Sequence, residues 1–248
     1  MGYSRAGFDE IVGVDNRPMP RYPFEFHQAD ALEYVAAHGH AFDAIHASPP
    51  CQGYSIMRNL PWLRHKEYPL LIQPTADALN ATGRAWVIEN VMGAKLASGW
   101  LCGTMFGLPF FRHRFFWAGG WFWLQPSHAI HRRRIRAGSS LMGRARASVF
   151  SEAEDARGVQ TWPGRRADRA GLTTWQTNGG QAGGVGIGPA KGARRAGIAM
   201  GVEWMKREEI TQAIPPVYTE YIGTQVMVCL KHAEGARKAV DDVQGGRL

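Results

Sequence analysis

Short apolar runs alternate with a segment of helical spacing in the first half of the chain. The apolar runs lie at residues 11–14, 42–47 and 86–88, and each has the length of a buried strand. Residues 69–82 have the spacing of a helix, which ends at Gly83. Strands that alternate with helices predict an α/β fold with a doubly wound parallel sheet.

Each predicted strand ends at polar or turn-forming residues. Asp15 follows the first run, Pro49-Pro50 follow the second, and Glu89-Asn90 follow the third. Ligands of a doubly wound sheet bind at the carboxyl ends of its strands. We therefore expect these three positions to lie at one functional edge of the sheet.

The pattern changes after residue 125. Just before it, aromatic residues at 115–117 and 121–124 predict two strands around a glycine turn. From about 126 to 195 the chain is rich in Arg, Ser and Gly and has little periodicity, which indicates a small second module. Helices are predicted again at 206–213 and from Pro216 towards Cys229. The predicted division is a catalytic core at 1–125, the basic module at 126–196, the rest of the core at 197–230, and a polar tail at 231–248 that frays.

The net charge of +8 is concentrated in the basic module. Residues 118–200 hold 13 Lys and Arg against 4 Asp and Glu, whereas the rest of the chain holds 16 against 17. Four of the arginines lie close together, at Arg132, Arg133, Arg134 and Arg136. Such a block suits a polyanion, because each phosphate contact releases counterions. A solvated surface insert would have the same composition, so charge alone leaves both interpretations open.

The amino-acid composition is that of a globular protein without a membrane span. Apolar residues make up 45% of the chain and charged residues 20%, which is ordinary for a globular protein. The chain has no apolar run of about 18 residues and no apolar signal-peptide core, so we expect a cytoplasmic protein without a membrane span. The three cysteines and nine histidines lack the spacing of metal ligands, which predicts no metal site. Cys102 and Cys229 are expected to be core residues.

Cys51 follows two prolines at the end of a predicted strand. Two prolines stiffen the turn and remove two amide donors, so the cysteine side chain is held in a fixed, open position. A thiol presented in this way becomes a nucleophile where nearby positive charge favours the thiolate. The alternative is the common one for a lone cysteine, a small buried apolar side chain.

Glu89, Arg112 and Arg114 place charged groups beside predicted strands. A carboxylate at the end of an apolar strand needs a partner or has a raised pKa. Arginines two positions apart lie on the same face of a strand, where they could hold a carboxylate or a phosphate. The alternative for Glu89 is a structural acid that caps the next helix.

Taken together, these segments resemble three signature motifs of the DNA cytosine-5 methyltransferases. The segments are Ser48-Pro49-Pro50-Cys51-Gln52-Gly53, Val87-Ile88-Glu89-Asn90-Val91 and Arg112-His113-Arg114. Residues 101–108 resemble the run that precedes Arg-x-Arg in phage and bacterial members, and residues 199–204 and 212–216 resemble the closing motifs. The basic module falls where the family has its variable target-recognition region. The resemblance implies a Rossmann-like, S-adenosylmethionine-dependent core that acts on double-stranded DNA as a monomer, in a bacterial or phage-infected cell.

The resemblance also implies a covalent mechanism. Cys51 would attack carbon 6 of cytosine, while Glu89 donates a hydrogen bond or a proton to ring nitrogen 3. Arg114, with Arg112, would stabilise the adduct. Carbon 5 would take the methyl group of S-adenosylmethionine, and loss of its proton would expel Cys51. The target base must leave the stacked duplex for this reaction.

The same resemblance assigns residues to the cofactor and to DNA. The cofactor residues would be Asp15, Asn16, Asp30, Ala31 and Pro49. Residues 52–67 would form the loop over the flipped nucleotide, in which Gln52, Ser55 and Arg58 contact DNA. From the target-recognition region, Arg132, Arg133, Arg134 and Arg136 would contact DNA.

The chain departs from the family pattern where the cofactor would bind. It begins at what looks like the helix after the family's first strand and glycine-rich turn, and its closing motif lacks the usual Gly-Asn. Loss of a central strand would leave both neighbours with unpaired edges. Three hypotheses follow: an active enzyme whose start lies upstream, a DNA-binding relic without methyl transfer, or an RNA cytosine-5 methyltransferase of the same architecture.

Overall fold

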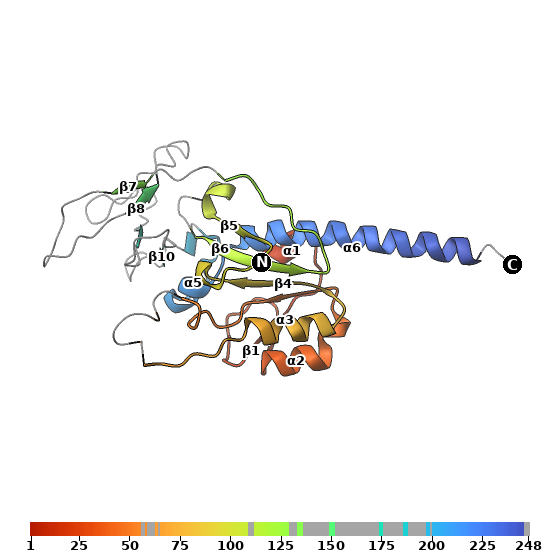
Figure 1. The fold of residues 1–248 in the computed structure, drawn as a ribbon, viewed down its shortest axis with the longest axis horizontal. Coiled ribbons are helices and arrows are strands. Elements are labelled where there is room, and N and C mark those ends of the chain that lie inside the picture. Colours follow the sequence, from red (N-terminus) through yellow and green to blue (C-terminus); the bar gives the residue numbers. More distant parts are fainter. Residues whose placement is uncertain are drawn as a thin grey trace, which may run out of the picture.

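A four-stranded mixed sheet forms the centre of the fold (Figure 1). The computed structural model describes residues 1–55, 58, 63, 65–108, 112–128, 133–135, 149–151, 174–175, 186–187, 197–198 and 200–245. The strands of the main sheet, in spatial order, are β3 (Ala44–Ala47), β4 (Ala85–Asn90), β6 (Arg114–Gly119) and β5 (Gly99–Leu101). β3 and β4 are parallel, whereas β6 runs antiparallel to both β4 and β5. The fold is therefore mixed α/β, as the sequence predicts, but the main sheet is not wholly parallel.

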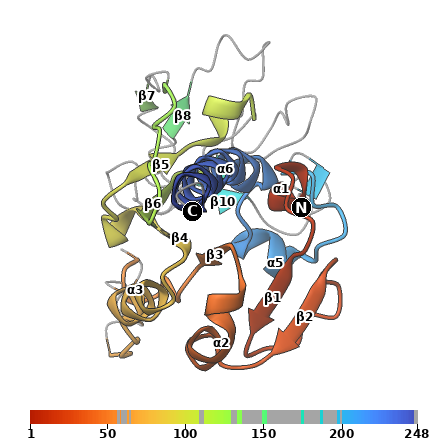
Figure 2. The same cartoon turned by 90° about the vertical axis from the view of Figure 1, so that its right-hand side faces the viewer.

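A separate two-stranded sheet pairs β1 (Val12–Asp15) with β2 (Glu25–Gln28) in parallel. The sequence pattern did not predict β2. Within the described residues, neither strand of this pair is bonded to the main sheet. Figure 2 shows β1 and β2 at the same end of the molecule as α2 (Ala31–His38). The three strand ends that the sequence placed at one edge are thus divided between two sheets: β1 belongs to the smaller sheet, and β3 and β4 belong to the main sheet.

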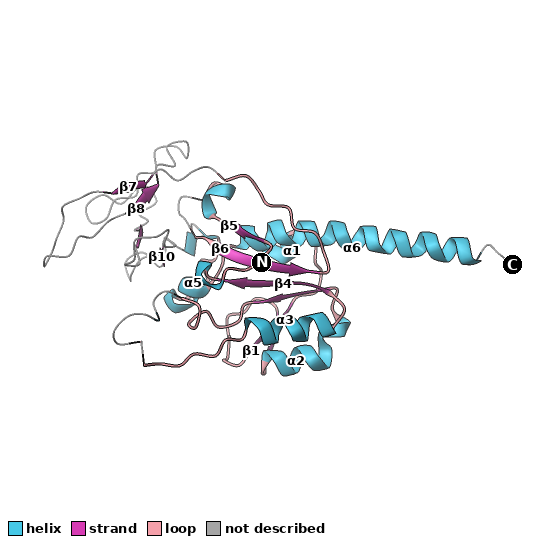
Figure 3. Ribbon diagram, viewed as in Figure 1, coloured by secondary structure: helices cyan, strands magenta, loops and turns pink. Residues whose placement is uncertain are grey.

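Helices cover both faces of the main sheet, as Figure 3 shows. On one face, α3 (Ile72–Ala81) packs Leu79 against Trp86 and Ile88 of β4. On the other, α6 (Pro216–Gly245) packs Tyr218 against Val87. All six residues of β4 are buried, so this strand is fixed from both sides and positions the residues at its carboxyl end.

The remaining elements are short. They are the helices α1 (Gly2–Arg5) and α5 (Arg207–Gln212), the 3-10 turns η1 (Gly39–Ala41), η3 (Met92–Ala94) and η4 (Gly103–Phe106), and the antiparallel pairs β7 (Arg133–Ile135) with β8 (Val149–Ser151) and β9 (Thr174–Trp175) with β10 (Gly186–Ile187).

Close packing between the two ends of the chain places α1 against α6. A Cβ atom on Gly2 would lie 2.0 Å from Thr219 Oγ1 and 2.1 Å from the main-chain oxygen of Pro216, so only glycine permits this approach. The neighbouring Tyr3 then reaches His46 on β3, with 2.6 Å between its hydroxyl oxygen and Nδ1. An N-terminal helix is thereby attached to the main sheet.

The predicted strand at 121–124 is wrong. Only the first of the two aromatic segments forms a strand, β6. The main chain of Leu124 instead bonds to side chains of α6: its amide donates to Gln225 Oε1 at 2.6 Å, and its oxygen accepts from Tyr221 Oη at 2.8 Å. Trp123 stacks on Phe116 with ring centroids 5.3 Å apart. Trp123 is buried, whereas Phe122 is 73% exposed, and neither residue joins a β-ladder.

The polar tail predicted to fray after residue 230 is helical, because α6 continues to Gly245. This last part of α6 extends beyond the rest of the fold (Figure 1), and residues 231–236 are exposed. Its Ala, Glu, Arg and Lys residues have high helix propensity, which favours a helix in this exposed segment. Within the described residues, no helix is both long and apolar enough to cross a membrane.

Candidate active site

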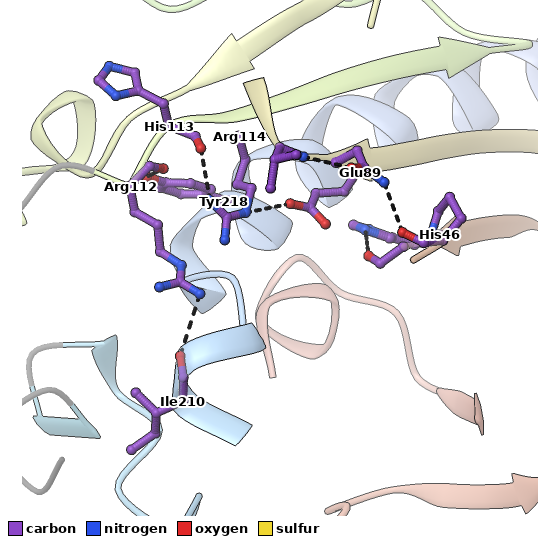
Figure 4. A network of polar contacts seen from close by, with 11 residues as sticks. His46, Glu89, Arg112, His113, Arg114, Ile210 and Tyr218 are labelled. Atoms are coloured by element: carbon purple, nitrogen blue, oxygen red, sulfur yellow. Dashed lines mark hydrogen bonds and ion pairs between the residues drawn. The ribbon is translucent and has the colours of Figure 1, made fainter. Parts of the chain in front are cut away.

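Glu89 and Arg114 form a buried ion pair between neighbouring strands. Glu89 lies near the end of β4, opposite Phe116 of the antiparallel β6, and Arg114 is the first residue of β6. Arg114 Nε lies 2.7 Å from Glu89 Oε1, and Figure 4 shows the guanidinium directed at the carboxylate. The side chain of Arg114 is 16% exposed and that of Glu89 is 9% exposed. Little solvent screens the pair, so its interaction is stronger than that of a surface ion pair.

The protonation of Glu89 is set by opposing effects. Burial raises the pKa of its carboxyl, while Arg114, Arg112 and a hydrogen bond from Ser48 act to lower it. The net direction is upward, because desolvation outweighs the neighbouring charges. Glu89 therefore retains its proton to a higher pH than an exposed glutamate does.

Asn90 attaches the loop that carries Cys51 to the end of β4. Its Nδ2 donates to the main-chain oxygen of Pro49 at 2.8 Å, and its Oδ1 accepts from the amide of Val91 at 2.9 Å. Asn90 is 1% exposed, so its side chain is shielded from water, while Pro49 and Val91 are half-buried. Since Pro49 lies two residues before Cys51, the position of the cysteine is linked to the strand that carries Glu89.

A turn fixes the chain directly after Cys51. The main-chain oxygen of Cys51 accepts from the amides of Tyr54 and Ser55, at 3.0 and 2.9 Å. Tyr54 Oη in turn accepts from the amide of Ile72 at the start of α3, at 3.1 Å. Cys51 itself is exposed, whereas Cys102 is buried and Cys229 is half-buried. Of the three thiols, the one in the predicted nucleophile motif is the most accessible.

His46 belongs to a polar chain that the sequence did not reveal. Its Nδ1 lies 2.6 Å from the Tyr3 hydroxyl and its Nε2 lies 3.3 Å from Ser48 Oγ, while Ser48 also bonds to Glu89. Burial lowers the pKa of His46 to about 4, so the imidazole is neutral near pH 7. If Nδ1 accepts from Tyr3, Nε2 carries the proton and Ser48 can donate to Glu89. The only signal in the sequence was a polar residue within the apolar run 42–47.

Arg112 reaches a different partner from Arg114. Its Nη2 donates to the main-chain oxygen of Ile210 in α5 at 3.5 Å, and its own main-chain oxygen accepts from Tyr218 Oη at 2.7 Å. Burial and the charge of Arg114 lower the pKa of Arg112 to about 9. In Figure 4 the two guanidinium groups point in different directions. Arg114 thus contacts Glu89, while Arg112 joins β6 to α5 and α6.

Four of the five predicted cofactor residues lie on or beside the β1–β2 pair. Asp15 ends β1, and its Oδ1 accepts from the amide of Arg17 at 2.8 Å. The main-chain oxygen of Asn16 accepts from Gln28 Nε2 at 3.1 Å. Asp30 caps α2 by accepting from the amides at 32 and 33, at 2.8 and 3.1 Å, and Ala31 is the first residue of that helix. The fifth, Pro49, lies beyond β3.

Helix α5 links the β1–β2 pair to the segment that carries Arg112. Arg21 pairs with Glu209, and Arg17 Nη2 donates to Gln212 Oε1 at 3.4 Å. From the other side, Arg112 bonds to Ile210. One short helix therefore contacts both the segment that follows Asp15 and the residue two positions before Arg114.

The predicted DNA-contacting residues are described only in part. Gln52 and Arg58 are exposed, Ser55 is half-buried, and Arg58 Nη1 donates to the main-chain oxygen of Gly53 at 2.7 Å. Arg133 and Arg134 lie in β7, but their side chains are not among the described ones. Arg132 and Arg136 lie outside the described residues.

Comparisons of the chain with protein-family models, with curated proteins and with solved structures gave no significant match.

Proposed function

We propose that the protein is a DNA cytosine-5 methyltransferase with a Rossmann-like methyltransferase core. The observation that supports this most is the meeting of three separate sequence motifs. Glu89 pairs with Arg114 at 2.7 Å, and the adjacent Asn90 holds Pro49 at 2.8 Å, two residues before Cys51. A thiol, a carboxyl of raised pKa and a guanidinium then share one end of the main sheet.

Cys51 would act as the nucleophile. Its thiolate forms a bond to carbon 6 of cytosine, and the electron pair of the carbon 5–carbon 6 double bond moves towards nitrogen 3. In the last step the proton on carbon 5 leaves, the double bond returns and the sulfur–carbon bond breaks. The accessibility of Cys51 supports this role, because the base must be turned out of the duplex to reach it.

Glu89 would donate its proton, or a hydrogen bond, to ring nitrogen 3. Its raised pKa supports this role, because an ionised carboxylate has no proton to give. Once the proton has moved, the remaining carboxylate is stabilised by Arg114. Ser48 lies between Glu89 and His46, so the hydroxyl can adjust its own hydrogen bond as the carboxyl changes charge.

The residues beside β1 fit the adenosine part of S-adenosylmethionine in chemical type. Asp15 offers a carboxylate at the carboxyl end of a parallel strand, which suits ribose hydroxyls. Asp30 caps α2 and accepts from the amides at 32 and 33, so this carboxylate fixes the start of the helix beside the proposed adenosine site. When bound, S-adenosylmethionine supplies the methyl group.

Double-stranded DNA is the proposed polymer. The excess of basic residues in 118–200 supports a phosphate-binding module. The same basic residues could contact the phosphates of RNA, so methyl transfer to DNA and to RNA must be compared in parallel. Methylation of RNA in preference to DNA would replace the proposed substrate without changing the proposed chemistry.

The proposal is tested with tritiated S-adenosylmethionine and duplex DNA of mixed sequence. The chain should transfer label to DNA, and Cys51→Ser should abolish transfer while DNA binding survives. Cys229→Ser is the matched control, because this half-buried cysteine lies on α6 away from the three motifs, and it should keep full activity. Near-complete transfer by Cys51→Ser would contradict the covalent mechanism.

A second candidate is a DNA-binding protein without methyl transfer. One observation favours it: within the described residues, the strand that carries Asp15 and the strand that leads to Cys51 belong to different sheets. Equilibrium dialysis with labelled S-adenosylmethionine separates the candidates. Saturable cofactor binding with label transfer supports the methyltransferase, whereas DNA binding without either supports the second candidate.

A further inference from the structure

Three possible metal ligands lie together beside β5 and β6. The side chains are Cys102, His113 and His128, and their candidate ligand atoms all lie within 4.8 Å of one another. Cys102 is buried and the two histidines are half-buried. The three residues are separated by 11 and 15 positions and include no closely spaced pair, so the spacing of cysteines and histidines gave no sign of this cluster.

The sheet itself brings two of these residues together. β5 and β6 are antiparallel, with Trp100 opposite Phe115 and Leu101 opposite Arg114. Continuing this register by one position puts Cys102 opposite His113. Directly opposed residues of an antiparallel pair have Cβ atoms about 5 Å apart and share one face. The first two ligands are therefore placed by backbone pairing.

Hydrogen bonds of the Gln125 side chain hold the segment that carries His128 against β5. Gln125 Oε1 accepts from the amide of Trp100 at 3.0 Å, and Gln125 Nε2 donates to the main-chain oxygen of Trp100 at 2.7 Å. Three residues later, His128 packs on the Trp100 ring with centroids 4.6 Å apart, and on His113 with centroids 5.7 Å apart. This arrangement holds His128 over the pair formed by Cys102 and His113.

We propose that Cys102, His113 and His128 bind a zinc ion. One thiolate and two imidazoles form a ligand set that zinc accepts, and three protein ligands leave a fourth position for water or another group. Zinc bonds of about 2.0–2.3 Å place the ligand atoms about 3.5 Å from one another. The three candidate ligand atoms already lie within 4.8 Å of one another, so small side-chain rotations bring them to this separation. Thr104 Oγ1 lies 3.3 Å from Cys102 Sγ and would bond to the bound thiolate as an outer partner.

The zinc site is separate from the proposed catalytic groups. In Figure 4 the His113 imidazole points away from Glu89 and Arg114, although His113 directly precedes Arg114. The ion would join both strands to His128, at the start of the basic module. We infer a structural role: zinc attaches the start of the basic module to β5 and β6.

Cobalt(II) provides a direct test, since it reports both tetrahedral geometry and thiolate bonding in its absorption spectrum. The full chain is freed of metal with a chelator and titrated with cobalt, and then with zinc. We expect a sulfur-to-cobalt charge-transfer band that saturates at one equivalent and is displaced by zinc. Absence of the band in the folded chain would overturn the proposal.

Variants identify the ligands. Cys102→Ser should remove the charge-transfer band, whereas Cys51→Ser and Cys229→Ser should keep it. His128→Ala should weaken cobalt binding by more than about tenfold, because loss of an outer-shell partner alone costs about 10- to 100-fold. This variant leaves the buried cysteine in place, so it remains informative if Cys102→Ser fails to fold. Cobalt affinity unchanged in His128→Ala, or a band that persists in Cys102→Ser, would contradict the assignment.

Discussion

Asn90 Nδ2 donates a hydrogen bond to the main-chain oxygen of Pro49 at 2.8 Å, and so joins the end of the most buried strand to the loop of Cys51. β4 is covered on both faces, and its residues therefore have little freedom to move. The loop has no such cover at Cys51, which is exposed. The position of the exposed Cys51 is thus linked to the buried strand through one amide side chain.

Replacement of Asn90 by alanine should loosen this loop. Because the variant removes the buried amide of Asn90 and leaves the half-buried Pro49 carbonyl without its donor, the free energy of unfolding should fall by about 1–3 kcal/mol. Methyl transfer should fall further than stability explains, with the loss in kcat and not in DNA affinity. Denaturant unfolding and steady-state kinetics provide the two measurements.

Gln73→Ala is the control for Asn90→Ala. It removes a surface hydrogen bond to Asp77, at 2.8 Å, on the exposed side of α3. Both stability and kcat should stay near their original values. Equal kcat for Asn90→Ala and Gln73→Ala would show that the Asn90 bond does not position Cys51.

The ion pair of Glu89 and Arg114 should show strong coupling. Arg114→Ala leaves the carboxylate of Glu89 buried without its close cation, which costs about 3–5 kcal/mol in typical buried pairs. Glu89→Gln should lower the free energy of unfolding less than Arg114→Ala does. Methyl transfer should fall by about 10²- to 10⁴-fold through loss of the proposed proton donor.

A double-mutant cycle measures this coupling. The combined variant should be more stable than the sum of the single losses predicts, because a neutral amide no longer needs the arginine. Strictly additive losses of free energy of unfolding would argue against a direct interaction. Arg5→Ala is a matched control, since its pair with Glu220 is at 3.6 Å and both side chains are well exposed, so its loss should be below about 1 kcal/mol.

His46 should make the protein less stable in mild acid. The pKa of this buried imidazole is lowered from 6.5 to about 4, so the unfolded chain binds a proton between these values that the folded chain does not. Its contribution to stability is therefore full above pH 6.5 and is lost as the pH falls towards 4. The shift corresponds to a loss on the order of 3 kcal/mol.

Comparison with His46→Gln isolates this effect. Glutamine does not titrate, so the slope of unfolding free energy against pH between 4 and 6.5 should be shallower in the variant. Glu89 acts in the opposite sense: its raised pKa makes stability fall as the pH rises above the ordinary value of 4.5. Identical slopes in both proteins would exclude His46 as the titrating group.

The last part of α6 should be dispensable for stability. Residues 231–236 are exposed, and this part of the helix extends beyond the other elements (Figure 1). A stop codon after Lys231 should therefore change the free energy of unfolding by less than about 0.5 kcal/mol while lowering the helical signal in circular dichroism. A large loss of stability would show that this segment packs on another part of the chain.

The sequence alone determined the elements whose patterns are local. Short apolar runs predicted β1, β3 and β4, and helical spacing predicted α3, because burial of one face or of a whole strand leaves a periodic trace in the residue order. The motifs around Cys51, Glu89 and Arg114 were likewise visible as residue types in order.

Tertiary structure alone decided how these parts meet. Leu124 bonds to side chains of α6 where the sequence predicted a β-ladder, and the two arginines flanking His113 reach different partners, because these contacts depend on distant segments. The same holds for the polar chain from Tyr3 through His46, and for the approach of His128 to Cys102 and His113. Residue order records which side chains a segment buries, but hydrogen bonds and ligand clusters between distant segments exist only after the chain has folded.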